Sequence, residues 1–501
     1  SGSPFSVAGD INIPIGDELS IENDVEVIFL DDYTFTVDGT LTADGISFAT
    51  LDEGEGDRQQ PAWRGLVFSS TAQASSLSNS VIKNASNPLV IHSNSVQVSG
   101  LTISKPDSLN FTDETAISIV DVSTSITNLN IENYAKGISI ENSSGNRIVT
   151  TPTLTNIRIK NSSQQSLPET TGIEINGFVE AGMFNVELED YQTGIKYVSD
   201  GSYQGTQTPT LTNIRIKNSS QQSREGSIGI YLKDLRIVNV INQPAFNDSI
   251  IGYDKGIVIE TELANTSTPT LTNIRIKNSS QQSRTEQTGI EIDGKVSASI
   301  NNVTLEDYYS GIKYSTTGTL ATTPTLTNIR IKNSSQQSRI TGSALDVKDV
   351  LQIGINDLEI EGYDTGIKLD NEQPVYATPT LTNIRIKNSS QQSRTDTRGI
   401  KTSGKTAPSI TGIDLENCTI GISLIGDGSI STTTPTLTNI RIKKSSQQSR
   451  TDTKGLYIKD MGNIIVNGDS IVGYVSGIEI ENELLNSSTP TLTNIRIKNS
   501  S

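Results

Sequence analysis

Residues 151–160 read Thr-Pro-Thr-Leu-Thr-Asn-Ile-Arg-Ile-Lys, and this segment decides the fold. Its apolar Leu and Ile residues alternate with Thr, Arg and Lys, a period of two that predicts a β-strand with one buried face. The segment recurs at intervals of 55 to 60 residues, which indicates a repeat architecture. The seven copies start at Thr151, Thr208, Thr268, Thr323, Thr378, Thr434 and Thr489.

Each repeat also contains a more variable half. Segments 125–138, 299–312 and 409–422 all read as an alternating strand, a short polar corner and a Gly-Ile pair that opens another strand. The constant half follows the same order, so one repeat of about 56 residues holds two coils of about 28 residues. Hairpin strands would recur about every 8–12 residues. The longer spacing predicts an all-β parallel β-helix solenoid, in which each strand pairs with its equivalent one coil later.

Stacked coils should align equivalent side chains into columns. One apolar column is predicted to contain Ile157, Val186, Ile214, Ile274, Val303, Ile329, Leu358 and Ile384. The outward position three residues later should form a charge ladder, because opposite charges on neighbouring strands attract. Its lysines, from the constant coils, are Lys160, Lys217, Lys277, Lys332, Lys387, Lys443 and Lys498. Its variable-coil members are Glu132, Glu189, Glu306, Glu361 and Glu416, with Ile251 and Val472 as exceptions.

The first 150 residues lack the constant segment but also alternate apolar and polar residues. We divide the chain into an acidic N-terminal β segment at 1–60, expected to cap the solenoid, non-repetitive coils at 61–150 and repetitive coils at 151–501. The opening, followed by Pro-Ala-Trp-Arg-Gly-Leu-Val-Phe at 61–68 and Leu-Ser-Asn-Ser-Val-Ile at 77–82, resembles bacterial cell-surface right-handed parallel β-helix proteins. These share the pectin-lyase-like fold. The resemblance implies a right-handed solenoid and leaves activity open, because this fold hosts lyases, hydrolases and adhesins.

Composition excludes several function classes. Hydrophobic residues make up 33% of the chain and aromatic residues 5%, which suits a thin repeated core. The formal net charge is −17, so nucleic acid is not an expected partner. No run of 18 apolar residues is present, so no membrane span is expected. The single cysteine, Cys418, forms no intrachain disulfide and is expected to be buried.

The sequence contains few residue patterns that are typical of catalytic sites. Polygalacturonase-like enzymes combine Asp residues with Gly-His-Gly and Arg-x-Lys motifs, but here Arg-Ile-Lys recurs seven times, whereas a catalytic motif occurs once. The only histidine, His92, has no glycine beside it. No nucleophile–base pair or phosphate-binding loop is recognisable, so we predict no catalytic residues, no cofactor and no enzyme.

Three weaker site predictions remain. An acidic cluster could bind Ca²⁺, with a solvated surface as the alternative: Asp52, Glu53, Glu55 and Asp57. Asn-Ser-Ser sequences could be N-glycosylated, with a stacked corner as the favoured alternative: Asn161, Asn218, Asn278, Asn333, Asn388 and Asn499. Tyrosines that follow the variable strands could form a buried corner stack or a weak glycan-binding stripe: Tyr134, Tyr191, Tyr253, Tyr308, Tyr363 and Tyr474.

The sequence starts at Ser1 without a leader, which fits a mature secreted protein, and it stops within a constant segment. We therefore expect either a longer native chain or self-association through exposed strand edges at the coil ends. The favoured function is a non-enzymatic extracellular rod, a surface-layer, filament or adhesin component, with glycans or cell-surface components as partners. The alternative is a β-helix that binds or cleaves polysaccharide, as a lyase or hydrolase.

Overall fold

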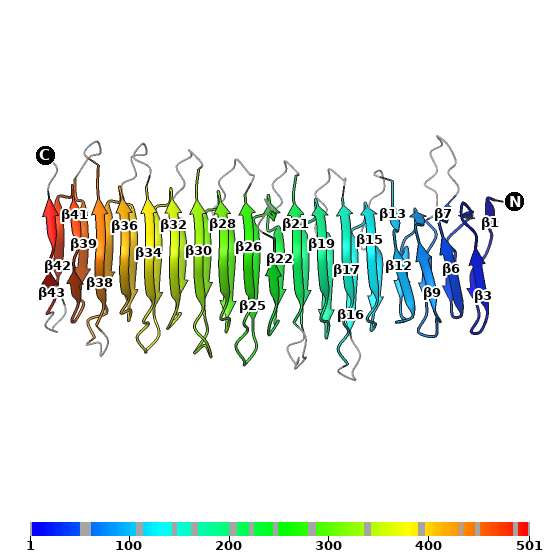
Figure 1. Ribbon diagram of the computed structural model, residues 1–501, viewed down its shortest axis with the longest axis horizontal. Coiled ribbons are helices and arrows are strands. Elements are labelled where there is room, and N and C mark those ends of the chain that lie inside the picture. The colour runs from blue at the N-terminus through cyan, green and yellow to red at the C-terminus, as the bar shows by residue number, and fades with distance from the viewer. Residues whose placement is uncertain are drawn as a thin grey trace. The chain divides into compact units, whose positions relative to one another are not determined.

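The computed structural model describes residues 3–50, 62–106, 114–142, 148–161, 169–199, 208–219, 225–243, 249–278, 287–334, 342–388, 396–429, 434–445, 451–483 and 489–498. Every regular element among these residues is a β-strand. The chain divides into two units, Ser1–Tyr253 and Asp254–Ser501. Each unit contains strands of two parallel sheets, here called sheet A and sheet B (Figure 1).

In unit 1 each coil contributes to both sheets. Sheet A contains β1 (Phe5–Val7), β3 (Glu18–Ile21), β4 (Glu26–Phe29), β6 (Thr40–Asp44), β7 (Ser47–Thr50), β9 (Ser75–Ser78), β10 (Val81–Lys83), β12 (Val96–Ser99), β13 (Thr102–Ser104), β15 (Ser125–Glu132), β17 (Thr153–Lys160), β19 (Gly182–Glu189), β21 (Thr210–Lys217), β23 (Asn239–Ile241) and β24 (Ile250–Ile251). Sheet B contains β2 (Ile11–Ile13), β5 (Thr34–Val37), β8 (Gly65–Phe68), β11 (Leu89–Ile91), β14 (Thr115–Val120), β16 (Lys136–Asn142), β18 (Thr171–Gly177), β20 (Thr193–Val198) and β22 (Ile228–Lys233).

Unit 2 repeats this arrangement. Its sheet A contains β26 (Thr270–Lys277), β28 (Ser299–Glu306), β30 (Thr325–Lys332), β32 (Gly354–Glu361), β34 (Thr380–Lys387), β36 (Ser409–Glu416), β38 (Thr436–Lys443), β40 (Ile465–Asn467), β41 (Ser470–Val472), β43 (Thr491–Thr493) and β44 (Arg496–Lys498). Its sheet B contains β25 (Lys255–Thr261), β27 (Thr288–Gly294), β29 (Ser310–Ser315), β31 (Ser343–Lys348), β33 (Thr365–Asn371), β35 (Arg398–Gly404), β37 (Ile420–Ile425), β39 (Lys454–Lys459) and β42 (Ser476–Glu481).

The predicted parallel β-helix is confirmed within each unit. In unit 1, Ile157 lies opposite Val186, and Val186 lies opposite Ile214. In unit 2, the predicted apolar column runs from Ile274 through three intermediate strands to Ile384. These side chains are at most 2% exposed, so each column forms part of a dry core.

The predicted coil length of about 28 residues does not hold along the whole chain. Between paired residues of sheet A, most repetitive coils take 26 to 29 residues, close to the expected 28, but the coil from Ile216 to Ile250 takes 34. Near the N-terminus, however, Val27 lies opposite Phe5 and Thr40 opposite Glu18, so these coils take only 22 residues. The coils shorten because their corners are tight: only Asp38 and Gly39 separate β5 from β6.

Asparagines inside the sheet A strands bend each strand at a fixed place. Asn156 has a φ of 57°, in the left-handed region that Asn tolerates better than most residues. Its side chain donates to Asn128 Oδ1 at 2.9 Å and accepts from Asn185 Nδ2 at 3.0 Å. Unit 2 contains the same ladder, for example from Asn328 to Asn302 at 3.0 Å. The bend separates the Thr-Leu-Thr half of the strand from the Ile-Arg-Ile-Lys half.

The tyrosines at the variable corners are buried, as the corner-stack interpretation predicts. Tyr134, Tyr191, Tyr253 and Tyr308 are 0% exposed, and Tyr363 and Tyr474 are at most 5% exposed. Tyr363 Oη donates to the Tyr308 carbonyl at 2.9 Å, across two coils. Cys418 takes the place of tyrosine in one coil, and its carbonyl accepts from Tyr474 Oη at 3.1 Å. The alternative of a glycan-binding stripe made by these rings is wrong, because the rings lie in the core.

Candidate functional sites

The outward face of sheet A brings the predicted Lys and Glu residues together. In unit 1, Glu189 lies between Lys160 and Lys217, with Nζ to carboxylate distances of 3.9 and 3.7 Å. Glu132 lies opposite Lys160. In unit 2 the same register joins consecutive strands in the order Lys277, Glu306, Lys332, Glu361, Lys387, Glu416 and Lys443. Ion pairs in this row include Lys277–Glu306 at 3.6 Å and Lys332–Glu361 at 3.7 Å.

A second charged row, made by the constant arginines, runs beside the first. Arg215 lies 3.7 Å from Glu187, and Arg441 lies 3.3 Å from Asp414. Arg275 reaches across to the first row and donates to both Glu306 oxygens, at 3.0 and 3.2 Å. The Arg-Ile-Lys motif therefore alternates with acidic strands as a repeated surface. Because these pairs are partly solvent-exposed, each contributes only about 0–1 kcal/mol to stability.

The asparagines proposed for glycosylation lie at a corner after the sheet A strands. Asn161, Asn218, Asn278 and Asn388 are 2–4% exposed, and Asn333 is half-buried. Lys444 replaces asparagine in one coil and donates from Nζ to the Cys418 carbonyl at 3.3 Å. The burial of these asparagines favours the stacked-corner alternative. Glycosylation stays a prediction, and the sugar would have to be attached before the chain folds. Asn499 lies outside the described residues.

The acidic cluster proposed for Ca²⁺, Asp52 to Asp57, also lies outside the described residues. Within the described ranges, no three His, Cys, Asp or Glu side chains gather closely enough to hold a metal ion. His92 directly follows β11, and its backbone N–H donates to the Phe68 carbonyl at 2.9 Å. The described part of the chain contains no helix long and apolar enough to cross a membrane.

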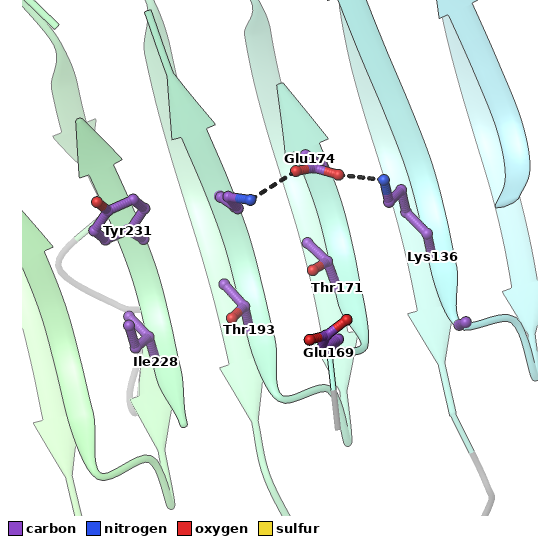
Figure 2. A pocket seen from close by; sticks show the side chains of 9 residues that line it. Lys136, Glu169, Thr171, Glu174, Thr193, Ile228 and Tyr231 are labelled. Carbon is purple, nitrogen blue, oxygen red and sulfur yellow. Dashed lines mark hydrogen bonds and ion pairs between the residues drawn. The ribbon is translucent and has the colours of Figure 1, made fainter. Parts of the chain in front are cut away.

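A groove in unit 1 was not anticipated from the sequence. It crosses β16, β18, β20 and β22 of sheet B and has a volume of about 620 Å³ (Figure 2). The register places its lining residues in two rows: Lys136, Thr171, Thr193 and Ile228 in the first, and Glu174, Lys196 and Tyr231 in the second. Ala135 and Glu169 complete the lining.

Glu174 organises the charges of this groove. Its carboxylate accepts from Lys196 Nζ at 2.9 Å and pairs with Lys136 Nζ on the other side (Figure 2). The Glu174 side chain is 11% exposed, and desolvation by itself would raise the pKa of its carboxyl group. The two lysines outweigh that effect and lower the pKa to about 2. Glu174 is therefore ionised at neutral pH and holds both ammonium groups in place.

Unit 2 contains a related arrangement. Lys255 and Glu291 occupy the positions of Lys136 and Glu174, and their side chains are 2.7 Å apart. Lys313 lies opposite Glu291, as Lys196 lies opposite Glu174. The next strand differs, because Asp346 lies opposite Lys313 where unit 1 has Tyr231. In the sequence, both sites are marked by Lys and Glu residues that alternate after successive Gly-Ile pairs. This alternation can be recognised only once the sheet B strands are aligned.

No protein-family model matches this sequence, and no curated protein matches it. Among solved structures, the chain is similar to the A-module of the Azotobacter vinelandii mannuronan C-5 epimerase AlgE6. The similarity covers 95% of this chain and 91% of that chain, with 11% sequence identity and a TM-score of 0.19. A score this low supports no argument about function.

Proposed function

We propose that the chain is a non-enzymatic extracellular structural or adhesive element, a component of a surface layer, a filament or an adhesin. The repeated outward face of sheet A carries this proposal. In each unit, copies of one eight-residue strand occupy alternate positions, and acidic strands lie between most of them. A surface that presents the same groups many times suits multivalent attachment or lateral packing.

The proposed absence of catalysis rests on how the basic residues are used. An enzyme concentrates its acid, base and stabilising groups around one reacting atom. Here the Arg-Ile-Lys residues are distributed along the sheet, and several are engaged with acidic neighbours, as in the Arg275–Glu306 and Lys332–Glu361 pairs. Repeated ion pairs of this kind stabilise strand register and do not form a reaction centre.

Self-association through coil ends belongs to the same proposal. In β43 and β44, Leu492 is 42% exposed and Ile497 is 55% exposed, whereas their equivalents Leu437 and Ile442 in β38 are 1% exposed. At the other end of the chain, Phe5 in β1 is 52% exposed. Exposed strand edges with apolar side chains favour pairing with a further coil, which a continuation of the same chain or a second copy could supply, and we propose the second copy.

Labelling and enzyme assays test the location and the lack of turnover. An antibody against the chain should label intact producing cells without permeabilisation. The purified full chain should release no unsaturated uronate or new reducing ends from alginate, polygalacturonate or neutral glucans. Labelling only after permeabilisation, or turnover that increases with protein concentration, would overturn the proposal.

Sedimentation of the full chain tests self-association. The average mass should rise with concentration, and Leu492→Lys with Ile497→Lys should suppress the rise. Phe184→Lys is the matched control, because Phe184 is 39% exposed on a sheet A strand away from the coil ends. Equal association of all three proteins would contradict docking through these edges.

A further inference from the structure

We infer that the groove over β16, β18, β20 and β22 binds a neutral pyranose segment of a glycan. This inference rests on the proposed adhesive function and gives it a specific contact. The groove volume of about 620 Å³ lies within the range of about 300–1,000 Å³ common for small-molecule sites. Its four strands span about 14 Å at the usual strand spacing, room for a short run of sugar rings.

The charges of the lining favour a neutral ligand. Lys136 and Lys196 both engage Glu174, and Glu169 adds a second carboxylate, so the four charges cancel. A uronate or phosphate would find no net positive charge to compensate for the loss of its hydration. A sugar hydroxyl, in contrast, can accept from the ammonium groups and donate to Glu174 or to the Thr193 hydroxyl.

The fourth strand supplies an apolar contribution. Ile228 and Tyr231 lie on β22 and both line the groove (Figure 2). A pyranose ring has a face of C–H groups that packs on apolar and aromatic surface, while its equatorial hydroxyls point sideways. Tyrosine combines such a surface with a polar hydroxyl group. The groove thus places hydrogen-bonding groups on β18 and β20 beside an apolar surface on β22.

Unit 2 serves as an internal control. Lys255 and Glu291 reproduce the first ion pair, but Asp346 stands where unit 1 has Tyr231. Asp346 also pairs with Lys368 at 3.3 Å, which adds charge to that position. The counterpart over β27, β29 and β31 therefore lacks the apolar contribution that Tyr231 gives, so the groove of unit 1 should bind the sugar and this counterpart should not.

Calorimetric titration of the full chain with defined hexasaccharides provides the test. The neutral probes are cellohexaose, mannohexaose and maltohexaose, and the acidic probe is hexagalacturonate. At least one neutral probe should bind with a dissociation constant of about 1 mM or tighter, and more tightly than the acidic probe. No neutral binding, or tighter binding of hexagalacturonate, would overturn the inference.

Variants locate the binding. Tyr231→Ser and Glu174→Gln should each weaken it about tenfold, the effect of losing roughly 1.4 kcal/mol. Glu291→Gln, the equivalent change in unit 2, should leave it unchanged. Circular dichroism and thermal unfolding identify any variant that fails to fold, and Tyr231→Phe then isolates the hydroxyl contribution. Wild-type affinity in folded Tyr231→Ser, or an equal loss in Glu291→Gln, would contradict this location.

The outcomes separate the two proposals. Surface labelling without sugar binding would preserve the adhesive or structural function and remove this site. Sugar binding without surface labelling would preserve the site and remove the extracellular function.

Discussion

The constant and variable coils form the same sheets but tolerate different irregularities. The constant strands β30 and β34 run through eight residues of sheet A without interruption. Two variable coils break that sheet, into β23 and β24 in unit 1 and into β40 and β41 in unit 2. Among the constant segments only the last is also split, into β43 and β44. The other constant coils therefore act as a regular template, whereas the variable coils supply acidic partners and local departures.

At these breaks, side chains accept the hydrogen bonds that the interrupted strand no longer accepts. At the break in unit 1, Asn242 Oδ1 accepts from the Ile214 N–H at 2.9 Å. At the break in unit 2, Asp469 Oδ1 accepts from the Ile440 N–H at 2.8 Å. In both cases the donor belongs to the constant strand, whose buried N–H would otherwise need another acceptor. A variable coil can thus lose strand pairing without leaving its constant neighbour unsatisfied.

The largest loss of stability is expected from substitutions in the core, and it would show that the constant and variable coils share one core. Ile331 on constant β30 and Leu305 on variable β28 are both 0% exposed. Replacing either with alanine removes buried methyl groups and leaves a cavity, which should cost about 2–5 kcal/mol. Denaturant unfolding of the two variants measures the loss. A change below 1 kcal/mol in only one variant would mean that the coil types are packed differently.

The next largest change in stability is expected at the break between β40 and β41 in unit 2. Asp469 is 4% exposed, and burial raises the pKa of its carboxyl group to about 6 despite the hydrogen bond from Ile440. Because the folded pKa exceeds the unfolded value, ionisation destabilises the fold as pH rises from about 4 to 6. Asp469→Asn should remove this penalty and stabilise the protein by about 2–3 kcal/mol above pH 6.

Asn242 already shows that an amide can fill the equivalent role in unit 1. Thermal unfolding at pH 4 and pH 7.5 provides the measurement for Asp469→Asn. The variant and the wild type should converge at the lower pH. A gap of equal size at both values would show that the effect is not ionisation.

A smaller effect concerns the bend in the constant strand. Asn328 has a φ of 53° and donates to Asn302 at 3.0 Å. Asn328→Ala should cost about 1–2 kcal/mol, because alanine is strained in this conformation and lacks the amide. Asn328→Gly relieves the strain, as the natural Gly412 with a φ of 67° does in a variable coil. Equal unfolding free energies for the two variants would contradict a conformational cause.

The smallest effect is expected from the charge ladder. Lys332→Met removes the pair with Glu361 at 3.7 Å, and the pair is 40% exposed on both sides. The cost should not exceed about 1 kcal/mol at low salt. It should diminish near 1 M salt, where the screening length is about 3 Å. A larger cost that persists in high salt would assign Lys332 a packing role instead.

The sequence was sufficient to predict the parallel coils because the constant segment repeats so closely. Ile157 and Ile274 stand in identical contexts, so their alignment in columns followed from period and spacing. The short N-terminal coils escaped prediction because their corners vary in length and no copy exists for comparison. The bend at Asn156 also escaped, since an asparagine within an alternating strand does not reveal its φ angle.

The groove in unit 1 was harder to anticipate than the fold. Lys136, Glu174 and Tyr231 come from three coils, spread over nearly a hundred residues of sequence. Only the register of sheet B brings them together, and loops of unequal length obscure that register in the sequence. The pairs of the charge ladder could be predicted from the sequence, because their spacing follows that of the constant segment.

Distances between spin labels on constant strands of unit 2 test the central claim most directly, namely that these strands lie in register at every second position. Labels on outward Lys277, Lys387 and Lys443 leave the core untouched, and Cys418 is buried. Strand spacing predicts about 19 Å between positions 277 and 387 and about 29 Å between 277 and 443, each with a narrow distribution. Broad distributions, or distances that do not increase in equal steps per repeat, would contradict the stacked coil.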